Sequence, residues 1–139
     1  MNIPYQLFEH TSDLGVEVRG DTLKDLFRNA ALAVLDLGME EAEAKPESIK
    51  IIEISESNPE LLLKEWLSEI VYQVMLMGFI CADIRIIQID RHQLQAELLG
   101  EQHNSKRQQI RRELKGITYH QLSIIRQERG WTARFVIDV

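Results

Sequence analysis

The last two residues of the chain place two carboxylates next to each other. Residues 131–139 read as an apolar strand, and the chain ends with Asp138 and Val139, so a side-chain carboxylate lies beside the α-carboxylate of the last residue. Hard cations such as Ca²⁺ and Mg²⁺ bind several oxygen ligands, and two acidic groups on a rigid strand are therefore candidate ligands. The alternative is a buried last strand whose Asp138 pairs with a lysine or an arginine, as structural ion pairs often do.

A second acidic group stands in a polar loop near the start of the sequence. His10, Thr11, Ser12 and Asp13 follow one another between two strand-like segments, and Gly15 comes soon after. Loops held by rigid strands are common positions for functional groups. Asp13 can bind a cation through oxygen, and His10 can orient it or take part in acid–base chemistry. The alternative is a turn in which these polar side chains bond to local backbone groups.

Other reactive side chains give weaker signals. Glu65 and Glu69 lie four residues apart and share a helical face, which suits either metal chemistry or an ordinary solvated surface. His120 falls in an expected strand, where it and Tyr119 point to opposite faces, and it is either a hydrogen-bonded structural residue or a catalytic one. The apolar neighbours of Cys81 disfavour the thiolate that a nucleophile needs. The sequence has no Walker A, GxGxxG, HExxH or GxSxG motif, and its four histidines show no zinc spacing.

The composition is that of an ordinary globular protein. The 139 residues are 45% hydrophobic and 27% charged, with one cysteine and a net charge of −6, which indicates one domain over residues 1–139 in a reducing compartment. No apolar run approaches a membrane span and the first residues lack signal-peptide features, so we expect a cytoplasmic protein.

The charges are unevenly distributed along the chain. Residues 1–99 carry 8 Lys or Arg against 18 Asp or Glu, whereas residues 100–139 carry 8 against 4. This acidic body disfavours general nucleic-acid binding. The basic run at residues 106–115 is either a solvated loop or a contact for an acidic protein or a phosphate.

The hydrophobic pattern predicts two helices among seven strands. Thr22 and Asp25 resemble a capping box, and Asn58-Pro59 is a strong helix start. The expected helices span residues 22–38 and 60–77, the second ended by Gly78. The expected strands are residues 5–8, 16–19, 49–55, 82–90, 93–100, 117–127 and 131–139, with a hairpin turn at residues 129–130. This order predicts an α+β fold, a two-layer sandwich in which two helices pack on one face of a mostly antiparallel sheet.

Ordered motifs along the whole chain resemble the archease family. They are residues 9–15 (EHTSDLG), 20–27 (GDTLKDLF), 61–71 (LLLKEWLSEIV), 115–120 (KGITYH) and 136–139 (VIDV), with Gly100-Glu101 and Trp131 also in the right order. Each motif alone is weak, but the ordered set is specific. The resemblance implies an accessory protein of GTP-dependent RNA ligation that is not itself an enzyme.

The resemblance also implies a site and a partner. A divalent cation, Ca²⁺ or alternatively Mg²⁺ or Mn²⁺, would be bound by Asp13, Asp138 and Val139. The partner would be the GTP-dependent RNA ligase that joins 2′,3′-cyclic-phosphate or 3′-phosphate ends to 5′-hydroxyl ends in tRNA splicing and RNA repair. The family promotes guanylylation of the ligase's active-site histidine. Lys115 and His10 would contact the ligase, and contact with RNA would be indirect or transient.

One stretch departs from the family pattern, and two other functions stay open. Many relatives carry an aspartate and a Lys-His-Glu cluster before Lys115, whereas residues 102–109 of this chain are QHNSKRQQ, which removes those acids as extra ligands. A metal-dependent phosphoesterase or nuclease would use the same carboxylates with His10 as base. A chaperone-like scaffolding module would use the cation only for stability. The sequence leaves the cation, the RNA substrates and the oligomeric state open.

Overall fold

The observed helices and strands lie close to the expected ones. The computed structural model describes residues 3–9, 13–102 and 110–139. The strands are β1 (Tyr5–Phe8), β2 (Leu14–Gly20), β3 (Ser48–Ser55), β4 (Ile80–Ile89), β5 (Gln93–Glu101), β6 (Gly116–Ile117), β7 (Ser123–Gln127) and β8 (Gly130–Asp138). The helices are α1 (Leu23–Gly38) and α2 (Pro59–Val71), and α2 continues into one turn of π-helix, Tyr72–Leu76. The α+β class is therefore confirmed.

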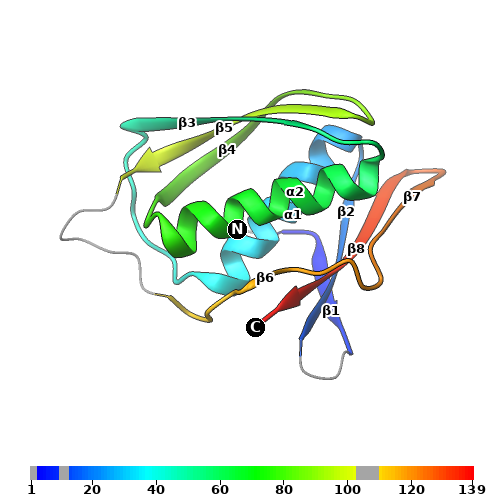
Figure 1. Cartoon of the computed structure of the whole chain (residues 1–139), viewed down its shortest axis with the longest axis horizontal. Coiled ribbons are helices and arrows are strands. Elements are labelled where there is room, and N and C mark those ends of the chain that lie inside the picture. Colours follow the sequence, from blue (N-terminus) through cyan, green and yellow to red (C-terminus); the bar gives the residue numbers. More distant parts are fainter. Residues whose placement is uncertain (1–2, 10–12, 103–109) are drawn as a thin grey trace.

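The strands form two antiparallel sheets. The larger sheet has the order β1-β2-β8-β6, with β7 also paired to β8, and the smaller sheet has the order β3-β5-β4. Figure 1 shows α1 and α2 in the middle of the molecule, with the smaller sheet on one side of them. Each helix contacts strands of both sheets, α1 through β2 and β4 and α2 through β3 and β6. Alternating apolar residues mark a strand but do not say which sheet it joins, so the division into two sheets was not apparent from the sequence.

Helix α1 begins where its capping residue allows it to begin. The Thr22 hydroxyl accepts a hydrogen bond from the Asp25 N–H at 3.0 Å, which satisfies one of the first N–H groups of the helix. The apolar stripe of α1 is completely buried at Leu26, Phe27 and Ala30, among others. This burial places the helix over the inner face of β2 and fixes the larger sheet beneath it.

Helix α2 is anchored by its cap and by a buried tryptophan. The Asn58 side chain accepts from the Leu61 N–H at 2.9 Å, and the Trp66 indole N–H donates to the Phe27 carbonyl at 2.8 Å. Trp66 is fully buried in the core, and its polar atom ties α2 to α1. Gly78, with φ of 70°, follows the π-turn and ends the helical segment.

The strand expected over residues 117–127 is wrong in its middle. Residues 118–122 form a turn between β6 and β7, in which the His120 N–H donates to the Thr118 hydroxyl at 3.1 Å and Gln121 has a φ of 53°. Tyr119 and His120 are both exposed in this turn, so they do not point to opposite faces of a strand. The turn exists because β6 and β7 pair with different parts of the same edge of β8.

No helix in the described parts of the chain has the combination of length and apolar character that a membrane crossing requires.

Candidate metal centre

Strand pairing brings the two candidate aspartates to one place. In the β2–β8 ladder Leu14 lies opposite Ile137 and Gly15 opposite Val136. Continuing this register by one residue places Asp13 opposite Asp138. Residues directly opposite each other on antiparallel strands have Cβ atoms about 5 Å apart. The sequence indicates Asp13 and Asp138 as candidate ligands, but only the strand register indicates that they are cross-strand neighbours.

The two aspartates share the face of the larger sheet that points away from the helices. Side chains alternate between faces along a strand, and Val16 and Ile137, which are adjacent to the site, are completely buried in the core. Asp13 and Asp138 therefore belong to the opposite face. Their accessibility agrees with this, since Asp13 is half-buried and Asp138 is exposed.

An aromatic ring packs beside the aspartate pair on the same face. A Cβ added to Gly15 would lie 2.4 Å from a Phe8 ring atom, so the ring rests directly on the Gly15 backbone. The Arg134 guanidinium lies 4.1 Å from the centre of the Phe8 ring, and its Nε is 3.4 Å from Glu17. These contacts fix one flank of the site and explain why a glycine follows two residues after Asp13.

The other flank of the site is formed by β6. Gly116 lies opposite Asp138, and the Lys115 N–H donates to the Asp138 carbonyl at 2.8 Å. A Cβ added to Gly116 would meet no atom within 4 Å, so this side of Asp138 is open. The same register places Lys115 opposite Val139, whose side chain packs partly buried against the core. The described candidate residues, Asp13, Lys115, Asp138 and Val139, thus lie at one end of the larger sheet, and Figure 1 shows the C-terminus beside β6.

The donor set fits a hard cation. Carboxylate oxygens are the ligands that Ca²⁺ and Mg²⁺ prefer, and two like charges directly opposite each other on a sheet repel, which a bound cation relieves. Among the described residues no group of three or more His, Cys, Asp and Glu side chains is placed to hold a metal. A cation here would therefore have two side-chain ligands among the described residues, and the Val139 carboxylate would be the third. His10 lies outside the described residues.

The other candidates have structural contacts. Glu69 accepts a hydrogen bond from the Gln73 amide at 3.0 Å, and a Glu65 carboxylate oxygen lies 4.0 Å from the Lys64 ammonium. Burial raises the pKa of Cys81 to about 12, so the thiol is protonated near neutral pH and is not a nucleophile. These observations agree with the structural interpretation of each residue.

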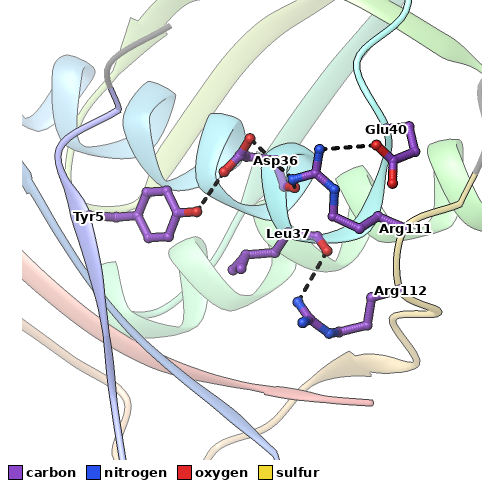
Figure 2. A network of polar contacts seen from close by, with 6 residues as sticks. All are labelled: Tyr5, Asp36, Leu37, Glu40, Arg111 and Arg112. Carbon is purple, nitrogen blue, oxygen red and sulfur yellow. Dashed lines mark hydrogen bonds and ion pairs between the residues drawn. The ribbon is translucent and has the colours of Figure 1, made fainter.

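The described end of the basic run binds the chain itself. The Arg111 side chain donates to the Asp36 carbonyl at 2.9 Å and to the Glu40 carboxylate at 3.2 Å (Figure 2). The Arg112 side chain donates to the Leu37 carbonyl at 3.4 Å. These arginines therefore cap the C-terminal end of α1, which has no basic residue in its own last turn. The sequence contains a signal for this cap, because α1 lacks a basic residue in its last turn and acidic residues lie near its end. The expectation of a solvated loop did not use that signal.

Fold and site together define a class, a small two-sheet α+β protein that presents an acidic pair on the sheet face opposite its helices. The model of the archease protein family (MTH1598/TM1083) matches residues 5–139. Protein archease of Saccharolobus islandicus is 36% identical, with 97% of this chain and 98% of that protein covered. Protein archease of Methanosarcina acetivorans is 30% identical, with 97% and 95% covered. The chain belongs to the archease family.

Solved structures confirm the fold. The solution structure of protein 1598 of Methanobacterium thermoautotrophicum has a TM-score of 0.76 at 24% identity, and covers 99% of this chain and 100% of its own. The crystal structure of an archease, described as a possible chaperone, from Thermotoga maritima has a TM-score of 0.60 at 21% identity, with 100% and 98% covered. At these identities, the similarity to both structures supports the fold and nothing beyond it.

Proposed function

We propose that this protein activates a GTP-dependent RNA ligase and is not itself the ligase. Membership of the archease family supports this function. Within the described residues, the observation that carries it is the cross-strand placement of Asp13 opposite Asp138, beside the open position at Gly116. The protein would act in the cytoplasm as one domain over residues 1–139, in tRNA splicing and RNA repair, and it would contact RNA only indirectly or transiently.

Asp13, Asp138 and the carboxylate of Val139 would hold one divalent cation. Oxygen ligands suit Ca²⁺, Mg²⁺ or Mn²⁺, and calcium is the ion that we expect from the family resemblance. When bound, the cation supplies positive charge that neutralises triphosphate oxygens during phosphoryl transfer to the ligase histidine. The carboxylates sit at the end of a sheet, on the face opposite the helices, so a partner's nucleotide site can approach them.

The remaining residues of the site would bind the partner. Lys115 is exposed, and its backbone N–H is fixed to the Asp138 carbonyl, so its backbone lies beside the residue that carries one of the two carboxylates. An ammonium at this point can bind an acidic group of the ligase or a phosphate. His10 belongs to the segment that leads into Asp13, and we propose that it also contacts the ligase.

The test measures guanylylation of the ligase histidine under limiting GTP. Wild-type protein should stimulate the reaction, whereas Asp13→Ala and Asp138→Ala should not. Glu128→Ala is a matched control, because Glu128 is an exposed acid in the turn at the opposite end of β8. Full stimulation by both aspartate variants would contradict the proposed site.

Assays on the same wild-type and variant proteins distinguish the proposed activator from the two other functions. Turnover of RNA ends by the isolated protein would identify a phosphoesterase or nuclease. A melting temperature that rises with calcium, together with stimulation that survives loss of both aspartates, would identify a scaffold with a structural cation.

A further inference from the structure

The C-terminal end of α1 is capped by residues far away in the sequence. A helix leaves its last carbonyl groups without partners inside the helix. Here the Gly38 carbonyl accepts from the Arg111 N–H at 2.8 Å and from the Arg112 N–H at 3.1 Å. The Asp36 and Leu37 carbonyls accept from the two arginine side chains. The cationic groups also lie at the negative end of the helix dipole, where they are favourable.

The same cluster holds strand β1. The Tyr5 hydroxyl donates to the Asp36 carboxylate at 2.6 Å, and another oxygen of that carboxylate lies 3.7 Å from the Arg111 guanidinium. Burial, with the hydrogen bond to Asp36, raises the pKa of Tyr5 to about 12, so this hydroxyl remains a donor at neutral pH. Figure 2 shows Tyr5 and Arg111 on opposite sides of Asp36. Strand β1 pairs with β2, where Phe8 lies opposite Gly15, so this cluster also holds the strand pair next to Asp13.

Residues 110–117 run from these contacts at the C-terminal end of α1 to the candidate site. Ile110 forms a β-bridge with Met39. Leu114 is buried, and it packs so closely on the end of α1 that a Cβ on Gly38 would lie 2.7 Å from it. The next residue, Lys115, donates its N–H to Asp138. Lys115, whose backbone flanks the site, is thus only four positions beyond Arg111.

We propose that Arg111 is a positioning residue of the candidate site. By fixing residues 110–117 to the end of α1, it sets where Lys115 and Gly116 lie against Asp138. Arg111 is far from the aspartate pair along the chain, and its side chain is occupied by Asp36 and Glu40, so it acts through the segment and not by touching the partner. The role of Lys115 in this inference rests on the proposed function, whereas the placement of the segment does not.

The first experiment is amide hydrogen exchange, which requires no ligase. In Arg111→Ala the exchange of the Lys115 and Gly116 amides should accelerate at least tenfold, while amides in the centre of β2 and β8 keep their protection. Arg111→Lys should be intermediate, because an ammonium keeps the charge but lacks the fork that reaches a carbonyl and two carboxylates together. Arg91→Ala, an exposed arginine in the β4–β5 turn, should change nothing at either amide. Unchanged exchange at Lys115, or equal acceleration throughout the sheet, would overturn the proposal.

The second experiment is a double-mutant cycle on ligase stimulation. If Arg111 acts through Lys115, the maximal stimulation of Arg111→Ala with Lys115→Ala should be no lower than that of Lys115→Ala alone. Multiplicative losses would overturn the positioning role. If the wild-type protein fails to stimulate, or Lys115→Ala stimulates fully, the proposed function fails at that point, while the exchange experiment still decides whether Arg111 places the segment.

Discussion

Replacing Asp138 by asparagine should stabilise the protein without calcium and abolish its stabilisation by calcium. Continuing the cross-strand register places the Cβ atoms of Asp13 and Asp138 about 5 Å apart, and we take the same spacing for their carboxylates. At that distance two unit charges in a medium as polar as water repel by about 0.8 kcal/mol. Salt screens part of this energy, so Asp138→Asn should increase the free energy of unfolding by about 0.5 kcal/mol in a chelator.

These energies correspond to measurable temperatures. Unfolding of a 139-residue chain has an entropy of about 0.3 kcal/mol/K, so a change of 1 kcal/mol moves the Tm by about 3 °C. The Tm of Asp138→Asn in EDTA should therefore rise by about 1–2 °C. Calcium at ten times its Kd should add about 1.4 kcal/mol to the wild type, which is about 5 °C, and this increment should disappear in the variant.

The assay is thermal unfolding followed by circular dichroism, in EDTA and over a calcium titration. Glu128→Gln is the control, since it removes an exposed acid from the turn at the far end of β8; it should change the Tm little and keep the calcium increment. Adding Asp13→Asn to Asp138→Asn should bring no further relief of repulsion. A lower Tm for Asp138→Asn in EDTA, or a calcium increment equal to that of the wild type, would refute both the pairing and the cation site.

Further predictions concern the C-terminus, Cys81 and the Asn58 cap. A C-terminal tag after Val139, or deletion of the last two residues, should weaken calcium binding by calorimetry and abolish ligase stimulation; a tagged protein that stimulates normally would show that the terminus is only the end of a strand. Because burial raises the pKa of Cys81 from 9.0 to about 12, the folded protein should resist alkylation by iodoacetamide at pH 8, and modification as fast as that of a free thiol would contradict this burial. The unfolded thiol ionises first, so this residue should lower stability as the pH rises from about 9 to about 12, and Cys81→Ser should flatten that slope in urea titrations. Asn58→Ala removes the cap at the Leu61 N–H and should cost about 1 kcal/mol in urea unfolding, whereas Asn58→Asp should retain the stability; equal stability of the alanine variant would show that the cap is redundant.

The features predicted well from sequence are those with a local cause. Thr22 and Asn58 start their helices through hydrogen bonds to residues three positions away, and Gly78 ends the second helical segment with a positive φ. Such signals lie within one turn of chain, so a single sequence contains them. The strands were also recognisable, because apolar side chains alternate along them.

The features that were missed depend on distant pairing. The strand expected over residues 117–127 breaks because β6 and β7 bond to separate parts of one edge of β8, which no local pattern records. Arg111 meets the Asp36 carbonyl 75 positions away, so a basic run that resembles a solvated loop becomes a helix cap. For the candidate site, the sequence identified Asp13 and Asp138 as candidate ligands. That both side chains lie on the same face of the sheet follows only from the register of β2 against β8.

Strand β8 connects these features, because its ladders place the described residues of the candidate site. Its β2 edge brings Asp13 to Asp138, and its other edge brings Lys115 and Gly116 to the same residue. A slip of one residue on the β2 edge would turn the Asp13 side chain to the core face. The site therefore exists only while both ladders hold their register, and a cation that binds it stabilises the folded chain by mass action. The cap that Arg111 provides protects the shorter of the two ladders, which has only two residues in β6, and this makes the segment at residues 110–117 the part of the site most sensitive to substitution.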